Sequence, residues 1–343
     1  MNKTSLKGSF FLFIADIVWG LAFVAQSVGM EHLNAFAFNS IRNFIGVIAL
    51  IPVLFWNIHK QQNNCQIKTA QVYQDSLEQG MHRAKPHTIS HIFTKDLLLG
   101  GLICGTALCL ASNFQQLGIE HSTVGKSAFI TTLYIIFVPI FEIFLSMIRK
   151  ARRTKHNTFK SENLSFTEVT PQEKVPLQVW FAVFSAMVGL YLLCMKDEIF
   201  VLSIGDIYLL LCAFFFTLQI IAVDYFVTKT NGIALSMMQF FVTGILSGIG
   251  MMFTELPSWT DIKACAIPLL YAGAISSGVG YTLQIVGQKY LQASVASLIM
   301  SLESVIATLA GWLLLKEVLS TKELIGCGLV FAAVILTQLP SKK

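Results

Sequence analysis

A carboxylate lies near the middle of a long apolar stretch in the C-terminal part of the chain. The stretch from Leu291 to Leu315 is long enough to cross the hydrocarbon core of a bilayer as one helix, and Glu303 is close to its centre. A carboxylate at that depth costs roughly 2.5–3.5 kcal/mol on insertion scales, so we expect Glu303 to face the protein interior. There it can bind a charged solute or a proton.

The residues around Glu303 favour close packing of helices. At helical spacing Glu303 shares a face with Ala296, Ala307 and Ala310. Small residues of this kind let neighbouring helices approach each other closely in lipid. The pattern therefore predicts a site buried within a bundle of helices.

Arg42 is the second charge that lies in apolar surroundings. Two interpretations apply to both Arg42 and Glu303. Each can be part of a buried ion pair or a hydrogen-bonded clamp that holds the two halves of the chain together, or each can contact a solute directly. The sequence leaves both interpretations open.

A polar stripe runs along the first apolar segment. Asp16, Trp19, Phe23 and Gln26 are separated by three, four and three residues and so share one helical face. An aromatic ring beside an acid can bind an amine or a zwitterion. Packing of the Trp19 ring against other side chains is the alternative.

Polar side chains recur in most of the other apolar segments. They cannot face lipid cheaply, because nothing there replaces their hydrogen bonds to water. We expect them to face one another or a hydrated cavity. The candidate solute-binding residues are Asp16, Trp19, Gln26, Arg42, Asn113, Tyr134, Gln219, Gln239, Tyr281, Gln284 and Glu303.

Composition identifies the elements that must position these groups. Of the 343 residues, 55% are hydrophobic and 13% are charged, whereas a soluble globular protein has about 25% charged residues. We therefore expect an all-α polytopic membrane protein with ten transmembrane helices. The apolar segments lie at about 8–28, 35–56, 97–119, 124–147, 176–195, 204–227, 232–254, 264–286, 291–315 and 322–339.

The basic residues predict the orientation of these segments. Most of the 24 Lys and Arg residues fall in the loops on the same side as the N-terminus. Since positively charged loops remain in the cytoplasm, both termini are predicted to be cytoplasmic. The net charge of +5 is accounted for by these loops and gives no reason to expect a nucleic-acid partner.

An internal repeat divides the chain. Gln116 corresponds to Gln288, 172 residues later, and Asn34 corresponds to Asn231, 197 residues later. Five segments per copy is an odd number, so the second copy must cross the membrane in the opposite direction. The predicted boundaries are 1–147 for the first four spans with a cytoplasmic loop at 57–93, 148–175 for a basic cytoplasmic loop, 176–203 for the fifth span, and 204–343 for the second copy.

One motif of about forty residues resembles a known family. Gln288-Lys289 is followed by a span of small residues, by Ser301-Leu302-Glu303-Ser304-Val305, by Gly311-Trp312 with three leucines, by Lys316-Glu317 and by Gly326. This order resembles the EamA-type permeases of the drug/metabolite transporter superfamily. Many members have proline after the glutamate, where this chain has Ser304.

The resemblance implies two inverted five-helix EamA repeats and a permease of the plasma membrane. Such a protein moves a small metabolite, such as an amino acid or a drug-like solute, by alternating access, more often as an exporter. Its partners are the solute, membrane lipid and, if transport is proton-coupled, protons titrating Glu303 or Asp16. No cofactor or metal is expected, because every histidine lies in or beside a loop. A membrane enzyme and a receptor or sensor are the alternatives; the first lacks a paired catalytic set and the second lacks a segment able to form a signalling domain.

Overall fold

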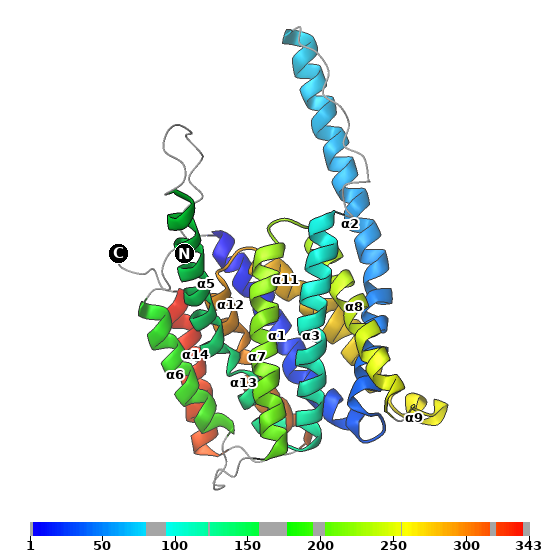
Figure 1. Ribbon diagram of the computed structural model, residues 1–343, viewed down its shortest axis with the longest axis vertical. Coiled ribbons are helices and arrows are strands. Elements are labelled where there is room, and N and C mark those ends of the chain that lie inside the picture. The colour runs from blue at the N-terminus through cyan, green and yellow to red at the C-terminus, as the bar shows by residue number, and fades with distance from the viewer. Residues whose placement is uncertain are drawn as a thin grey trace.

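The structure is a computed structural model in which every described residue that belongs to a regular element is helical (Figure 1). The remainder of the predicted loops 57–93 and 148–175, beyond Gln79 and Asn157, lies outside the described residues. The described residues are 3–79, 94–122, 124–157, 177–194, 203–254, 256–315 and 320–338.

Each predicted apolar segment falls on one or more helices, although several boundaries differ from the prediction. Eight helices, counted over the described ranges, are long and apolar enough to cross a membrane, as expected of a multi-pass membrane protein. In chain order the elements are α1 (Lys3–Met30), α2 (Ala35–Gln79), α3 (Lys95–Glu120), α4 (Val124–Thr131), α5 (Tyr134–Asn157), α6 (Leu177–Cys194), α7 (Ile204–Phe226), α8 (Gly232–Met252), α9 (Trp259–Ala264), α10 (Ala266–Leu270), the π-helix η2 (Tyr271–Tyr281), α11 (Thr282–Gln288), α12 (Ala293–Met300), α13 (Leu302–Leu315) and α14 (Thr321–Gln338).

Two helices continue into segments that were predicted to be loops. Helix α2 runs on through residues 57–79 and projects well beyond the bundle (Figure 1). Helix α5 likewise extends to Asn157. Residues 57–79 contain neither glycine nor proline and are rich in glutamine, which loses little side-chain freedom in a helix. The polar composition that suggested a loop is therefore also compatible with a solvated helix.

Two of the predicted spans are broken rather than continuous. The span at 124–147 is interrupted at Thr132 and Leu133, and the span at 291–315 is interrupted at Ser301. Thr132 Oγ1 donates to the carbonyl of Ala128 at 3.0 Å, and Ser301 Oγ donates to the carbonyl of Leu298 at 2.7 Å. These hydroxyls satisfy carbonyl groups close to each interruption.

The two interruptions lie next to each other. Ser304 Oγ, one turn into α13, is 3.1 Å from the carbonyl oxygen of Ala128 and 3.2 Å from Thr132 Oγ1. The broken spans thus cross where both have lost their regular backbone pattern. This crossing places the first residues of α5 and α13 in the interior of the protein.

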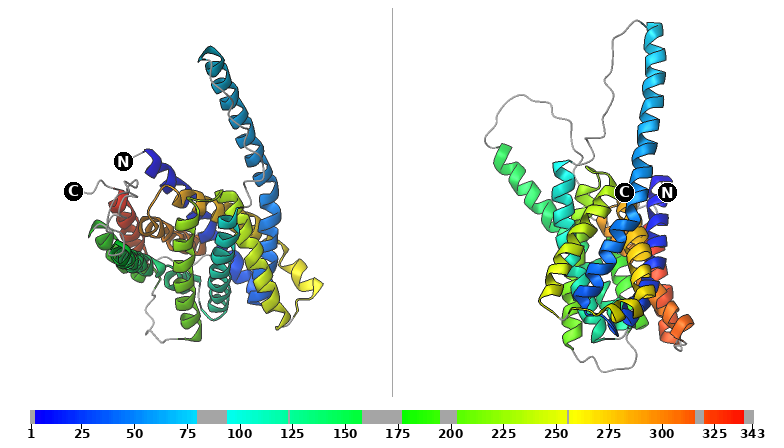
Figure 2. Two further views of the ribbon diagram at one scale, coloured as in Figure 1. Left: turned by 45° about the horizontal axis from the view of Figure 1, so that its top comes forward. Right: turned by 90° about the vertical axis from the view of Figure 1, so that its right-hand side faces the viewer.

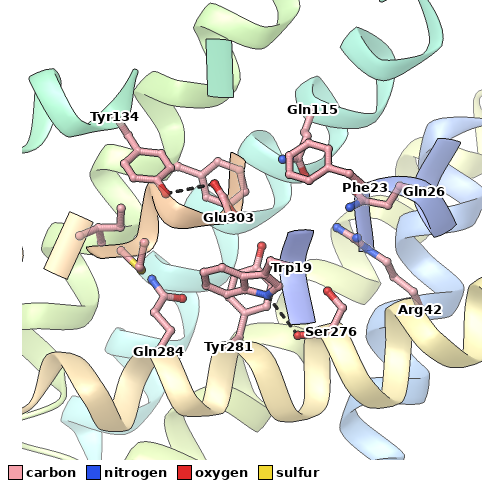
Figure 3. A pocket seen from close by; sticks show the side chains of 13 residues that line it. Trp19, Phe23, Gln26, Arg42, Gln115, Tyr134, Ser276, Tyr281, Gln284 and Glu303 are labelled. Carbon is pink, nitrogen blue, oxygen red and sulfur yellow. Dashed lines mark hydrogen bonds between the residues drawn. The ribbon is translucent and has the colours of Figure 1, made fainter. Parts of the chain in front are cut away.

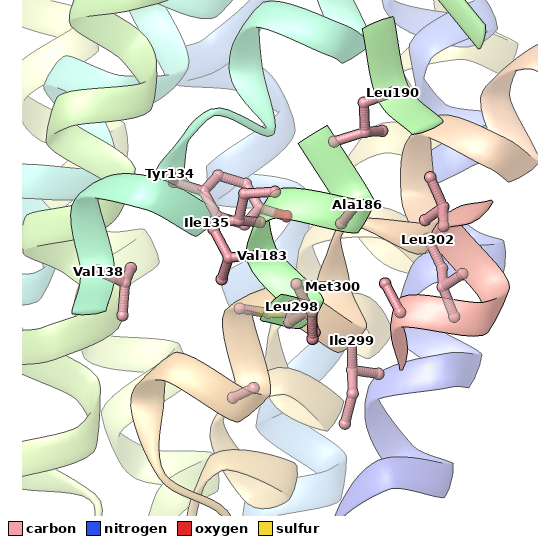
Figure 4. Packing of buried hydrophobic residues seen from close by; sticks show 14 of the residues in the cluster. Tyr134, Ile135, Val138, Val183, Ala186, Leu190, Leu298, Ile299, Met300 and Leu302 are labelled. Atoms are coloured by element: carbon pink, nitrogen blue, oxygen red, sulfur yellow. The ribbon is translucent and has the colours of Figure 1, made fainter. Parts of the chain in front are cut away.

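A pair of helices packs against one side of this crossing. Helices α6 and α14 lie side by side (Figures 1 and 2) and approach closely at Gly189, where an added Cβ would lie 2.8 Å from the carbonyl oxygen of Gly326. Val183 and Ala186 of α6 belong to the largest buried apolar cluster, together with Ile135 of α5 and Met300 of α12 (Figure 4). Through this cluster, α6 packs against α5 and α12 of the two broken spans.

Helices α3 and α8 also approach closely through a glycine. A Cβ at Gly105 would lie 2.6 Å from Val242 Cβ and 2.8 Å from the carbonyl oxygen of Gln239. Thr243 Oγ1 donates to the carbonyl of Gly105 at 2.9 Å. The sequence Gly101-x-x-x-Gly105 therefore forms a helix-contact face.

We expect Gly105→Ala to lower the free energy of unfolding by about 1–3 kcal/mol, because the new methyl group would force α3 away from α8. Gly125→Ala is the matched control, since no atom lies within 4 Å of the Cβ position there. The control should be neutral or stabilising by about 0.4–1 kcal/mol. Thermal unfolding of both purified variants in detergent measures the difference, and equal midpoints would contradict the close contact.

Candidate functional site

A cavity lies at the centre of the bundle, beside the crossing of the broken spans (Figure 3). Its walls come from α1, α2, α3, α5, α7, η2, α11, α12 and α13, so both halves of the chain contribute. Seven of the predicted site residues line it: Trp19, Gln26, Arg42, Tyr134, Tyr281, Gln284 and Glu303.

Glu303 is held at the start of α13 by a tyrosine from the other half of the chain. Tyr134 Oη donates a hydrogen bond to Glu303 Oε1 at 3.0 Å (Figure 3). Tyr134 is the first residue of α5 and Glu303 is the second residue of α13, so both follow an interruption directly. The N-terminal end of a helix carries a partial positive charge that favours a carboxylate. The interruptions thus position Glu303 and also lower the cost of burying it.

Arg42 lies in another part of the cavity wall and forms no ion pair with Glu303. Its side chain is buried, its Nε atom lacks a hydrogen-bond partner, and its guanidinium carbon lies 5.8 Å from the centre of the Phe38 ring. Of the two interpretations of the charges, Glu303 satisfies both: it makes a hydrogen bond between the halves and it faces the cavity. Arg42 is a cation that lines the cavity, and no carboxylate of the described residues forms an ion pair with it.

Two aromatic rings in contact form another part of the cavity wall. The rings of Trp19 and Tyr281 have centroids 4.8 Å apart, and Trp19 Nε1 donates to the carbonyl of Ser276 at 3.3 Å. Ser276 and Tyr281 belong to the π-helix η2, an element that occurs frequently at functional sites. Gly280 allows the contact, because a Cβ there would lie 2.6 Å from Trp19 Nε1.

Four predicted residues are buried but do not line the cavity. They are Asp16, Asn113, Gln219 and Gln239. Asp16 is fully buried, and its carboxylate oxygens have no hydrogen-bond partner among the described residues. Gln219 and Gln239 are hydrogen-bonded to each other at 3.3 Å.

Asn113 belongs to a polar cluster that joins three helices. It donates to the carbonyl of Cys109 and to Ser247 Oγ, each at 2.8 Å, and accepts from Asn39 Nδ2 at 3.1 Å. These contacts connect α3 to α8 and α2. Asn113 therefore stabilises the bundle at a distance from the cavity.

Six residues of the cavity wall were not among the predicted site residues. Phe23 lies on the polar stripe of the first segment, and Gln115 stands between two polar residues, so both had a signal in the sequence. Phe216, Ile220 and Met300 had none, because apolar residues in an apolar span look alike in sequence. The sixth is Ser276.

Comparison with known proteins gives three results. The sequence model of the EamA-like transporter family matches residues 6–149 and 203–339. An uncharacterized transporter of Archaeoglobus fulgidus is 26% identical over 331 residues, which cover 96% of this chain and 84% of that protein. A solved protein crystal structure has a TM-score of 0.67 at 13% identity, covering 97% of this chain and 98% of that one, a similarity that concerns the fold alone.

We expect Asn113→Ala to lower the free energy of unfolding by about 1–2 kcal/mol, because it removes the buried hydrogen bonds that join Asn113 to Asn39 and to Ser247. Gln115→Ala, two residues away on the cavity wall, is the control and should cost less. The check is the thermal midpoint of each variant in detergent. A larger loss for Gln115→Ala would contradict the assignment of Asn113 to helix packing.

Proposed function

The chain belongs to the EamA-like transporter family, and from this membership we propose that it is a permease that moves a small solute by alternating access through the cavity between Arg42 and Glu303. The observation that carries the proposal is the cavity itself. Residues from both halves of the chain line it, among them the guanidinium of Arg42 and the carboxylate of Glu303, which do not form an ion pair with each other. Charges exposed to a cavity in this way are available to a charged ligand.

The chemistry of the cavity wall favours a zwitterion of amino-acid type. A guanidinium such as that of Arg42 binds a carboxylate through paired hydrogen bonds, and Glu303 offers a carboxylate to an ammonium group. Trp19 and Tyr281 line the same cavity, and the faces of their rings attract a cation as well. A solute with an ammonium group and a carboxylate would satisfy both charges at once.

We propose ten transmembrane helices arranged as two inverted five-helix repeats, with the boundaries given by the sequence. Equivalent hydrogen bonds in the two halves support this arrangement. Gln116 Nε2 of α3 donates to the carbonyl of Gln26 in α1 at 3.1 Å, and Gln288 Nε2 of α11 donates to the carbonyl of Ile220 in α7 at 3.2 Å. The interrupted spans at Thr132 and Ser301 also occupy corresponding places in the two halves. Inverted repeats with broken helices at the midplane are a common plan of transporters.

Two contacts on opposite sides of the α4–α5 interruption would serve as gates. Lys126 Nζ of α4 forms an ion pair with Asp206 Oδ2 of α7 at 2.8 Å. Beyond the interruption, Ser294 Oγ of α12 donates to Glu142 Oε2 of α5. In our proposal one contact opens while the other stays closed, so that the cavity communicates with one side of the membrane at a time.

The remaining parts of the proposal concern location and direction. The excess of Lys and Arg on the side of the N-terminus supports a plasma-membrane protein with both termini in the cytoplasm. In this orientation Lys126 and Asp206 lie toward the outside. We propose net export of the solute, with Glu303 or Asp16 as the titrating carboxylate if protons drive the exchange.

Glu303→Gln tests the role of the central carboxylate. We expect the rate of solute exchange to fall at least about tenfold, because the amide cannot offer a full negative charge to an ammonium group, and we expect the pH dependence of exchange to weaken. The measurement is counterflow of radiolabelled L-amino acids into liposomes that contain the purified full chain.

Glu323→Gln provides a matched control for this experiment. Glu323 is also buried, but it caps α14, where its Oε2 accepts from the backbone N–H of Ser320 at 2.6 Å. The control should keep the wild-type rate per folded protein. If Glu303→Gln kept both the rate of exchange and its pH dependence, the proposed site would be wrong. If the wild-type protein exchanged none of the radiolabelled L-amino acids, a receptor or an enzyme would be favoured.

A further inference from the structure

Three buried glutamines form a hydrogen-bonded chain that leads away from the cavity wall. Gln284 Nε2 of α11 donates to Gln219 Oε1 of α7 at 3.2 Å, and Gln219 Nε2 donates to Gln239 Oε1 of α8 at 3.3 Å. All three are at most 2% exposed. Only Gln284 lines the cavity.

The chain has a direction, since each link uses the donor of one amide and the acceptor of the next. At the cavity end, the amide nitrogen of Gln284 donates to Gln219, and Gln284 Oε1 has no hydrogen-bond partner in the part of the chain that the structure describes. Figure 3 shows this oxygen on the side of Trp19. At the far end, Gln239 Nε2 is the unpartnered atom.

The internal repeat relates one member of this chain of glutamines to Arg42. Gln239 lies 197 residues after Arg42, at the corresponding position of the second half. The side chain of Arg42 lines the cavity directly. Gln239 does not, and is connected to the cavity wall through the side-chain amides of Gln219 and Gln284. The first half therefore presents a cation from this position, and the second half presents the carbonyl oxygen of Gln284.

We propose that Gln284 Oε1 is a hydrogen-bond acceptor for an N–H group of the solute, and that Gln219 and Gln239 are positioning residues that fix its orientation. This inference rests on the proposed function. An ammonium group has three N–H donors, and Oε1 of Glu303 already accepts a hydrogen bond from Tyr134. A buried acceptor left empty is costly, so a site built around one rejects solutes that lack the matching donor.

N-methylation of the solute removes these donors one at a time and leaves the positive charge in place. For the wild-type protein we expect the N,N-dimethyl derivative of the best-exchanged L-amino acid to compete at least ~tenfold more weakly than the parent. In Gln219→Leu the amide of Gln284 loses its fixed orientation. The ratio of the two competition constants should then fall toward one, mainly through weaker binding of the parent, while the rate at saturating parent is retained.

Gln288→Leu is the matched control. Gln288 is an equally buried glutamine, one turn beyond Gln284 on α11; it does not line the cavity, and its amide nitrogen donates to the backbone carbonyl of Ile220 and not to another glutamine. A structural role common to buried glutamines would change both variants alike. We expect Gln288→Leu to keep the wild-type ratio, and Gln239→Leu to shift the ratio in the same direction as Gln219→Leu but less.

The outcomes separate the two proposals. A Gln219→Leu protein with the wild-type ratio, or a Gln288→Leu protein that loses discrimination equally, overturns the role of the glutamine chain and leaves the proposed function standing. Wild-type protein that exchanges none of the L-amino acids overturns both. If Gln219→Leu does not fold, judged by size-exclusion chromatography, the ratio for Gln239→Leu decides.

Discussion

The constraint on which the rest of the structure depends is the cost of placing polar groups where no water can reach them. Glu303 meets it with a hydrogen bond from Tyr134 and with a place in the first turn of α13. Tyr134 and Glu303 each directly follow an interruption, which brings the N-terminus of α5 and of α13 into the interior. The apolar cluster around α6 and α12 then holds the interrupted spans together. The burial of Glu303 therefore depends both on the interrupted backbone and on the apolar packing around it.

Much of the fold could be predicted from the sequence. Apolar segments of about twenty residues indicate helices directly, and in the described chain eight helices are long and apolar enough to cross a membrane. The interruptions at Thr132 and Ser301 and the π-helix at 271–281 could not be predicted, because hydroxyl-to-carbonyl hydrogen bonds and a shifted backbone pattern leave the apolar periodicity unchanged. The helical course of residues 57–79 was missed for a related reason: polar composition describes solvation, and it does not exclude a helix.

The candidate site was predictable to the extent that polarity signals it. Trp19, Arg42 and Glu303 stood out by type and depth, and the structure brings them to one cavity. Polarity could not tell which buried amides reach the cavity and which bond to one another, since Gln219 and Gln284 look equivalent in sequence. The distinction depends on the rotation of α7 against α11, which arises only when the helices pack.

The two halves are alike in plan but differ in chemistry. Gln116 and Gln288 each donate a hydrogen bond to a backbone carbonyl of a neighbouring helix. By contrast, Arg42 corresponds to Gln239 in the second half, and Glu303 corresponds to Thr131 in the first half. The hydroxyl of Thr131 lies 3.9 Å from Cys212 Sγ. In the proposed repeat, corresponding positions thus carry side chains of different charge.

The position of Asn113 outside the cavity has a consequence for divergence among relatives. Helix association at this level relies on Asn39, Asn113 and Ser247, and none of them lines the cavity. Gln115 and Ser276 can therefore drift during evolution with little penalty in stability. One architecture can in this way acquire new cargoes through a few neutral substitutions.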